Sequence, residues 1–474
     1  MPRLFGVLLM LGWFLVGVAI LALTVCIVSP KLGAMLALPI LFVYPHMYMV
    51  RLGLLPWNIG IDDLFICVLF LVVAVRSNFL GQTPLRMSFS LIGVLTLAAL
   101  LVVANLSGWS RVPSEMPIVI LKPILKGFVF VLFVYCMVHT INTERDLRQM
   151  SLVYVLTMTA AAFTVILYRF FPAQLVLFAS SEDVERAQQW WGIAPRSVGS
   201  LESANTGCAL LAMAVLFCLV CTRLPARIWV KSVLLGCIPV LLAAMVLTQS
   251  RSGGLALAAT LALMCVASRS RLWSGALVFG IICAMVLRSD LFWEYRERVL
   301  DVYNPAVGGQ WGGNAAARFE VWEAYILGLD AQTLLLGQGR VVGMIRYGLH
   351  THSTYVSVIA LMGLGGVIWA LAFFTTFGRR AWATVRMGVQ PYSTYASAVA
   401  WSMVAWAVAG LTLDMLLTFL PQYTMLFYAV VVERSHDLSR QARAVPALSL
   451  ASAGWASRLY AVGGAPGRRP GLVS

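Results

Sequence analysis

The sequence predicts an all-α integral membrane protein that crosses the bilayer many times. Of its 474 residues, 61% are hydrophobic and only 11% are charged, and the mean hydropathy is +0.87. A soluble domain carries about 25% charged residues. The apolar residues form runs that match a bilayer crossing of about 20 residues. Together these observations predict about 12 or 13 transmembrane helices.

The predicted crossings divide the chain into four parts. Residues 1–288 and 353–433 hold the apolar runs, and residues 289–352 form a long loop. Residues 434–474 are rich in Ala, Gly, Pro, Ser and Arg, which predicts a disordered cytoplasmic tail. Prolines interrupt the second run, and the last run is short. The number of transmembrane helices is therefore either 12 or 13. The runs are Leu4–Val28, Leu32–Val50, Ile61–Val75, Met87–Ala104, Ile118–Val138, Met150–Phe171, Ala204–Cys221, Ser232–Leu247, Gly253–Ala267, Leu272–Leu287, Thr354–Phe377, Tyr395–Leu413 and Leu416–Val432.

The basic residues of the predicted loops set the orientation. They cluster on one side of the membrane, which explains the net charge of +15 without a nucleic-acid partner. By the positive-inside rule this side is cytoplasmic. The loops at 172–200, 249–253 and 289–352 then face outward, which is the periplasm in a bacterium. The basic clusters contain Arg223, Arg227, Lys231, Arg269, Arg271, Arg379, Arg380, Arg386, Arg434, Arg440 and Arg443.

The long loop is predicted to contain an amphipathic helix over Ala315–Gly328. Arg318 and Trp322 are four residues apart and share one helix face. Phe319, Trp322 and Ile326 form an apolar stripe at helical spacing. This pattern is typical of a helix at a membrane surface, with its polar groups turned toward an aqueous site.

Three arginines stand on the predicted outer side: Arg196, Arg251 and Arg318. Snorkelling to headgroups explains one such residue, but three on the side that the positive-inside rule disfavours indicate an anion site. Arg251 precedes Ser252 and two glycines at a predicted helix start. An N-cap serine, glycines that allow close approach, free N–H groups and a guanidinium favour a phosphate. At headgroup depth, this anion is the phosphate or diphosphate of a lipid.

Two histidines, His350 and His352, end the long loop just before a predicted transmembrane helix. A neutral imidazole at His352 is suited to accept a proton from an incoming hydroxyl group, because histidine titrates near neutral pH. From this residue alone, an interfacial histidine without a chemical role is the alternative interpretation.

Five segments together resemble the O-antigen ligase and O-antigen or exopolysaccharide polymerase superfamily. In chain order they are RSVGSLESAN, TQSRSGG, RFEVW, LLLGQG and HSTY leading into LMGLGG, within residues 190–370. The resemblance implies a bacterial inner-membrane glycosyltransferase with a GT-C-like helical fold. Members transfer a glycan from undecaprenyl diphosphate to an acceptor hydroxyl at the periplasmic face.

The resemblance also implies roles for single residues. Arg251 and Arg318 match the essential arginines of the superfamily, and His352 matches its essential histidine. Arg196 lies in the recurrent segment upstream. Ser353 is a departure, because an Asn commonly follows the histidine.

The chemistry of these residues and the resemblance to the superfamily predict the same mechanism. Arg251 and Arg318 bind the diphosphate and stabilise the charge that develops as the glycosidic bond breaks, with contributions from Arg196 and Ser252. His352 activates the acceptor hydroxyl for attack from the opposite face, with inversion at the anomeric carbon. The arginines take the place of a divalent metal, so neither a metal nor another cofactor is expected.

A second set of charges permits a rival interpretation. Asp62 and Asp63 begin the third apolar run on the outer side. They either form part of a metal site or stabilise a helix N-terminus, and the second interpretation is favoured because no third ligand is near. Lys122 and Lys126, four residues apart in the fifth run, are expected to face a cavity or contact a lipid diphosphate.

Three functions remain open from the sequence. A ligase joins a finished glycan to an acceptor such as the lipid A core, and a polymerase joins repeat units into a longer glycan. Both use an undecaprenyl-diphosphate-linked donor within membrane lipid. The third is a multi-pass transporter or flippase of a lipid-linked glycan. Against it, the runs carry few charges and show no inverted repeat.

Overall fold

A computed structural model gives the fold of the chain. It describes residues 17, 20–43, 49–50, 59–79, 88–109, 117–170, 199–201, 203–268, 313–340, 342–343, 351–416 and 418–462. The elements are α2 Pro30–Phe42, β1 Met49–Val50, β2 Ile59–Gly60, α3 Ile61–Ala74, η1 Val75–Phe79, α4 Phe89–Trp109, α5 Pro117–Thr140, α6 Glu144–Phe170, α8 Ala204–Cys221, α9 Ile228–Thr248, α10 Arg251–Ser268, α13 Gly313–Leu327, α14 Ala331–Leu336, α16 Thr354–Met387, α17 Tyr392–Ala409 and α18 Phe419–Val462. The two short strands pair with each other in antiparallel fashion.

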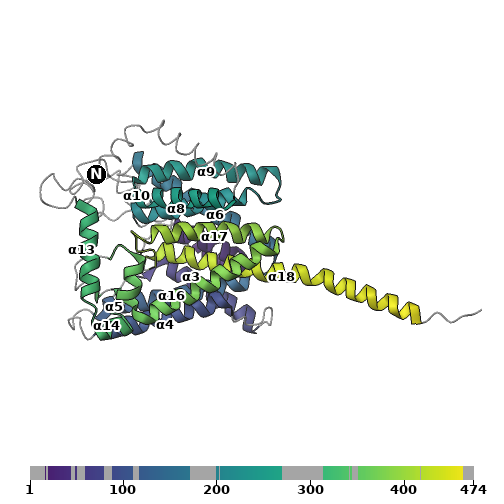
Figure 1. Cartoon of the computed structure of the whole chain (residues 1–474), viewed down its shortest axis with the longest axis horizontal. Helices are drawn as coiled ribbons and strands as arrows, with labels where there is room; N and C mark the ends of the chain where they lie inside the picture. The colour runs from purple at the N-terminus through teal and green to yellow at the C-terminus, as the bar shows by residue number, and fades with distance from the viewer. Residues whose placement is uncertain are drawn as a thin grey trace, which may run out of the picture.

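Apart from α13, which lies across one end, the long described helices pack side by side in one bundle (Figure 1). Six of them are long and apolar enough to cross a membrane: α4, α5, α6, α8, α9 and α16. The protein is therefore an all-α multi-pass membrane protein, as the sequence predicts. Each predicted run from Ile61 onward coincides with a helix, except Leu272–Leu287, which lies outside the described residues. The second run forms a shorter helix than expected, since α2 ends at Phe42.

The most deeply buried of the candidate membrane spans is α8, with 89% of its residues buried inside the protein. The hydroxyl of Ser402 on α17 donates to the carbonyl of Met213 on α8 at 2.9 Å. The hydroxyls of Tyr154 on α6 and Tyr428 on α18 lie 2.9 Å apart, and both rings pack on Phe217 of α8. These contacts hold α6, α8, α17 and α18 as one core, which fixes the positions of their ends.

One end of the bundle, called the basic end below, is held by ion pairs and helix caps. Lys31 pairs with Asp146 at 2.9 Å. The Nε of Arg434 donates to the carbonyl of Ile141 at 2.6 Å. The carboxylate of Glu433 accepts the first two N–H groups of α4. The described basic residues that the sequence places in the cytoplasm lie at this end, whereas Arg269 and Arg271 lie outside the described residues. The opposite end is called the site end.

The chain after residue 433 differs from the predicted disordered tail. It continues α18 to Val462, and this helix projects from the bundle in Figure 1. Arg434, Ser435, Leu438 and Ser439 are buried at helical spacing. The polar composition predicted disorder, but these four residues bury one face of the segment against the basic end.

A break in α16 determines how the chain before it is held. Gly363 has φ 66° and ψ −164°, a conformation that is essentially limited to glycine. Beside the break, the carbonyls of Ala360 and Leu361 accept the N–H groups of Gln338 and Gly339 at 3.4 and 3.0 Å. The segment LLLGQG therefore packs directly on LMGLGG.

We expect Gly363→Ala to lower thermal stability strongly. A Cβ at this position would lie 2.6 Å from the nitrogen of Gly337 and 2.8 Å from the oxygen of Leu335. The backbone conformation alone would cost about 1–3 kcal/mol. Gly378→Ala on the same helix is the matched control, because nothing lies within 4 Å of a Cβ there. Melting temperatures in detergent measure the difference, and equal values for the two variants would contradict the expectation.

Candidate functional site

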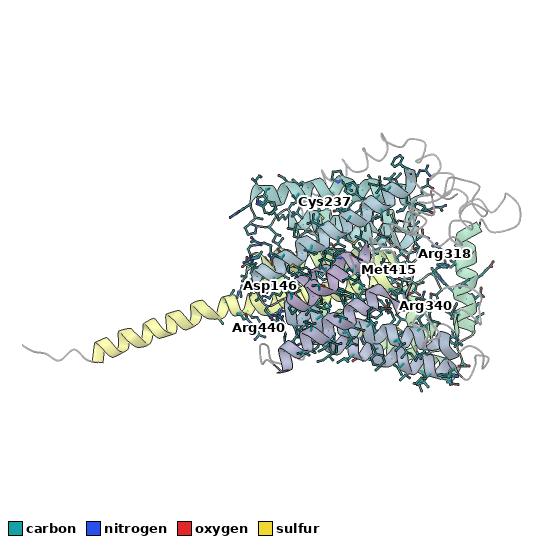
Figure 2. The ribbon with its side chains drawn as sticks, turned by 180° about the vertical axis from the view of Figure 1, so that it is seen from behind. Asp146, Cys237, Arg318, Arg340, Met415 and Arg440 are labelled. Carbon is teal, nitrogen blue, oxygen red and sulfur yellow. The ribbon has the colours of Figure 1, made fainter. Side chains whose placement is uncertain are left out.

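The site end gathers polar groups from distant parts of the chain. Figure 2 shows Arg318, Arg340 and Met415 at this end, and Asp146 and Arg440 toward the basic end. In Figure 1, α13 runs across the site end of the bundle, where α10 and α16 begin. Residues far apart in the sequence are thus placed on one surface of the membrane protein.

Arg251 is the first residue of α10. The preceding helix α9 ends at Thr248, and Gln249 turns the chain with a left-handed φ of 51°. This turn starts α10 earlier than expected. Ser252 therefore lies within the first turn rather than at the N-cap, and its hydroxyl is 3.0 Å from that of Ser250. The short turn presents Arg251 at the site end.

Gly253 allows α10 to pack closely on α8. A Cβ at this position would lie 2.4 Å from the sulfur and 2.6 Å from the carbonyl carbon of Cys208. The sequence predicts that this glycine lets a phosphate approach the backbone, whereas in the structure the group packed against Gly253 is Cys208 of α8. Because α8 is the most deeply buried span, this contact fixes Arg251 to the rigid core.

The helix predicted over Ala315–Gly328 is confirmed as α13, Gly313–Leu327, and it carries Arg318. The indole N–H of Trp322 donates to the carbonyl of Thr351 at 2.5 Å. This bond fastens α13 to the residue before His352. Through this hydrogen bond, α13 is held next to the segment that contains His352.

The other face of α13 points away from the bundle. Phe319 and Ile326, two residues of the predicted apolar stripe, are 63% and 54% exposed, whereas Val321 and Tyr325 are buried. The exposed residues Glu320 and Glu323 lie on the same side, so the outward side of α13 carries both apolar and acidic groups, as on a helix at a membrane–water boundary. The membrane-surface position of α13 stays a prediction.

His352 adopts a left-handed backbone conformation with φ 49°, which is uncommon for residues other than glycine. Ser353 follows as the residue before α16. The hydroxyl of Thr354 donates to the carbonyl of Leu413 and accepts the N–H of Met415, each at 2.8 Å. The start of α16 is thus locked to the connection between α17 and α18, and the position of His352 is set from both sides.

Arg318 interacts electrostatically with Arg251 and with His352. Burial and the charge of Arg251 lower the pKa of Arg318. Burial and the charge of Arg318 lower the pKa of His352. The histidine is therefore neutral at neutral pH, whereas an arginine stays charged. Two neighbouring guanidiniums repel each other, and a bound anion relieves that repulsion. These three residues are called the arginine–histidine group below.

Arg196 and His350 lie outside the described residues. The chain that follows Arg196 is described from Gly199 onward. The hydroxyl of Ser200 donates to the carbonyl of Phe42 at 2.6 Å, and its N–H donates to the hydroxyl of Thr164 at 3.0 Å. These bonds attach the segment to the site ends of α2 and α6.

Asp62 and Asp63 lie in the first turn of α3, as the favoured interpretation of these acids predicts. The Nζ of Lys126 lies 2.9 Å from the carboxylate of Asp62 and also contacts that of Asp63. Lys126 is buried, whereas Lys122 is exposed. Across the described part of the chain, no set of three or more His, Cys, Asp or Glu side chains is arranged to hold a metal ion.

Arg340 is a polar residue of the site end that the sequence reasoning missed. It follows LLLGQG, and its guanidinium carbon lies 5.8 Å from the ring centre of Phe419. The Nζ of Lys126 lies 5.1 Å from the same ring centre. Arg340 stands in the loop that the sequence predicts to face outward, where the positive-inside rule disfavours a basic residue. A basic residue on the disfavoured side of the membrane singled out Arg318, and the same criterion would have singled out Arg340.

Comparison with known proteins assigns no family to the chain. No protein-family model matches it, and no curated protein matches it. The case for a function therefore rests on the residues of the site end.

Proposed function

We propose that this protein is an inverting membrane glycosyltransferase of the O-antigen ligase or polymerase type. It transfers a glycan from undecaprenyl diphosphate to an acceptor hydroxyl. The observation that carries the proposal is that Arg318 interacts electrostatically with both Arg251 and His352, which come from two other segments, at one end of a multi-pass bundle. The basic residues of the opposite end support a periplasmic site in a bacterial inner membrane.

In the proposed reaction, the acceptor oxygen bonds to the anomeric carbon as the bond from that carbon to the diphosphate oxygen breaks. Negative charge develops on the diphosphate, and Arg251 and Arg318 stabilise it. His352 accepts the proton of the acceptor hydroxyl, for which the imidazole must be neutral. Its lowered pKa favours that state. Arg196 and Ser252 are proposed to contribute to diphosphate binding.

The proposed chemistry uses arginine in place of a metal. Two guanidiniums supply the positive charge that the leaving diphosphate needs, and each can form paired hydrogen bonds with phosphate oxygens. The carboxylates of Asp62 and Asp63 are paired with Lys126. No metal or other cofactor is part of the proposal.

Purified protein in lipid nanodiscs with an undecaprenyl-diphosphate-linked glycan tests the proposal. With EDTA present, we expect release of undecaprenyl diphosphate together with a new glycan product. A ligase glycosylates added lipid A–core, whereas a polymerase lengthens the lipid-linked glycan without it. A transporter or flippase instead moves the labelled donor across a proteoliposome membrane and releases no diphosphate. That outcome would replace the proposal.

The pH dependence of transfer is expected to report His352. A protonated imidazole cannot accept the acceptor proton, so kcat/KM falls as the pH decreases through the histidine pKa. Because burial and Arg318 lower that pKa, the acid limb of the wild type lies below the pH at which an exposed histidine titrates. The Arg318→Gln variant lacks the positive charge that helps to lower the pKa of His352. We therefore expect the acid limb of the variant's residual activity to lie at higher pH than that of the wild type. An unshifted limb would disprove the assignment.

A further inference from the structure

A second set of polar side chains lies at the site end. Asp62, Asp63, Lys126, Gln338 and Arg340 are called the second polar group. Figure 1 shows α10, which begins with Arg251, toward one side of the bundle. It shows α4, α5 and α14 toward the other side, with α13 running across the end between them. The second polar group belongs to this other side.

The second polar group and His352 are connected through one short piece of chain. Met415 bonds to Thr354, two residues after the histidine. Phe419, whose ring lies near both Lys126 and Arg340, follows four residues later. Four residues reach at most about 14 Å. This limit applies to the Cα atoms of Met415 and Phe419, so a short piece of chain links the surroundings of His352 to those of Lys126 and Arg340.

Two buried amides in this region have polar atoms without a hydrogen-bond partner among the described residues, although Nδ2 of Asn105 donates to the carbonyl of Leu101 at 2.7 Å. Gln338 is 1% exposed, and neither of its amide atoms has a partner among the described residues. The same holds for Oδ1 of Asn105, also 1% exposed. A Cβ on Gly339 would lie 2.7 Å from that oxygen, so both amides border the same turn. An unsatisfied buried polar group costs about 1–3 kcal/mol. Such amides therefore favour a ligand that donates and accepts hydrogen bonds.

The charges of this group distinguish its ligand from a diphosphate. The two negative charges of the aspartates and the two positive charges of Lys126 and Arg340 give the group a net charge of zero. The arginine–histidine group instead carries an excess of positive charge. A neutral set of donors and acceptors suits the hydroxyls of a saccharide, since carboxylates accept and guanidiniums donate.

We propose that the second polar group binds the acceptor saccharide of the transfer reaction. This inference rests on the proposed function and assigns a surface to each substrate. The donor diphosphate lies at Arg251 and Arg318, and the acceptor hydroxyl reaches His352 from the side of α14. Asp63, the more open of the two carboxylates at 22% exposure, accepts sugar hydroxyls, and Arg340 donates to sugar oxygens.

The test separates acceptor use from donor use in purified variants. Lipid A–core and the lipid-linked glycan serve as acceptors in separate arms, and transfer to water reports the donor side alone. Arg340→Gln is expected to raise the acceptor KM roughly tenfold, because it removes hydrogen bonds from a charged donor. Donor KM and transfer to water stay within about twofold. Arg340→Lys recovers part of the loss. Arg386→Gln at the basic end, whose guanidinium lies 4.9 Å from the ring of Trp382, is the matched control.

Gln338→Met supplies a readout that a structural role does not give. Replacing an unsatisfied buried amide by an apolar side chain keeps or raises the melting temperature, while the acceptor KM rises if the amide binds a saccharide. An unchanged acceptor KM in both Gln338→Met and Arg340→Gln overturns the inference. So does a rise in donor KM in either variant. Absence of any transfer by the wild type instead refutes the proposed function.

Discussion

Replacing His352 is expected to lower transfer by about 10²–10⁴-fold, the usual contribution of a general base. His352→Asn is the preferred variant, because asparagine tolerates the left-handed φ of 49° that this position requires. The loss should fall on kcat, with donor binding retained, since the imidazole acts on the acceptor proton. Product formation over time at saturating donor and acceptor measures it.

His436→Ala is the control for the histidine prediction. Its ring lies at the basic end, with Nδ1 3.2 Å from the hydroxyl of Thr384, and we expect its transfer rate to stay near that of the wild type. A His352→Asn protein that transfers at the wild-type rate would show that another group removes the proton, and the proposed base would be wrong.

Arg251→Gln and Arg318→Gln are each expected to lower kcat/KM by about 10²–10³-fold, because each removes a donor from the developing diphosphate charge. Both arginines act on the same anion, so the double variant loses less than the product of the single effects. Lysine at either position keeps the charge but not the paired hydrogen bonds, and restores only part of the activity. Arg386→Gln serves again as the control. Additive losses would indicate that the two arginines bind different groups.

Hydrophobic runs and helix periodicity made much of the fold predictable. A bilayer crossing is a property of local composition, so the described spans coincide with runs read from the sequence. The amphipathic helix α13 follows from residue spacing in the same way. The continuation of α18 past residue 433 did not follow, because the burial of Arg434 depends on contacts with Ile141 and Asn142 far earlier in the chain.

The candidate site was predictable only as separate pieces. The motifs LLLGQG and LMGLGG were both recognisable, but their contact depends on the glycine-only break at Gly363. Asp62 and Asp63 were read as acids of a helix N-terminus, while their pairing with Lys126 joins two helices and has no local signal. Long-range side-chain pairing is set by how the helices pack, and that information is not local in the sequence.

The central claim is that Arg251 and Arg318 together hold the diphosphate of a lipid-linked glycan beside His352. An experimental structure of the protein bound to undecaprenyl diphosphate tests it most directly. We expect diphosphate oxygens at about 2.7–2.9 Å from nitrogens of both guanidiniums, with the face of His352 open toward the acceptor side. A diphosphate bound instead at Lys122, with neither arginine in contact, would contradict the account.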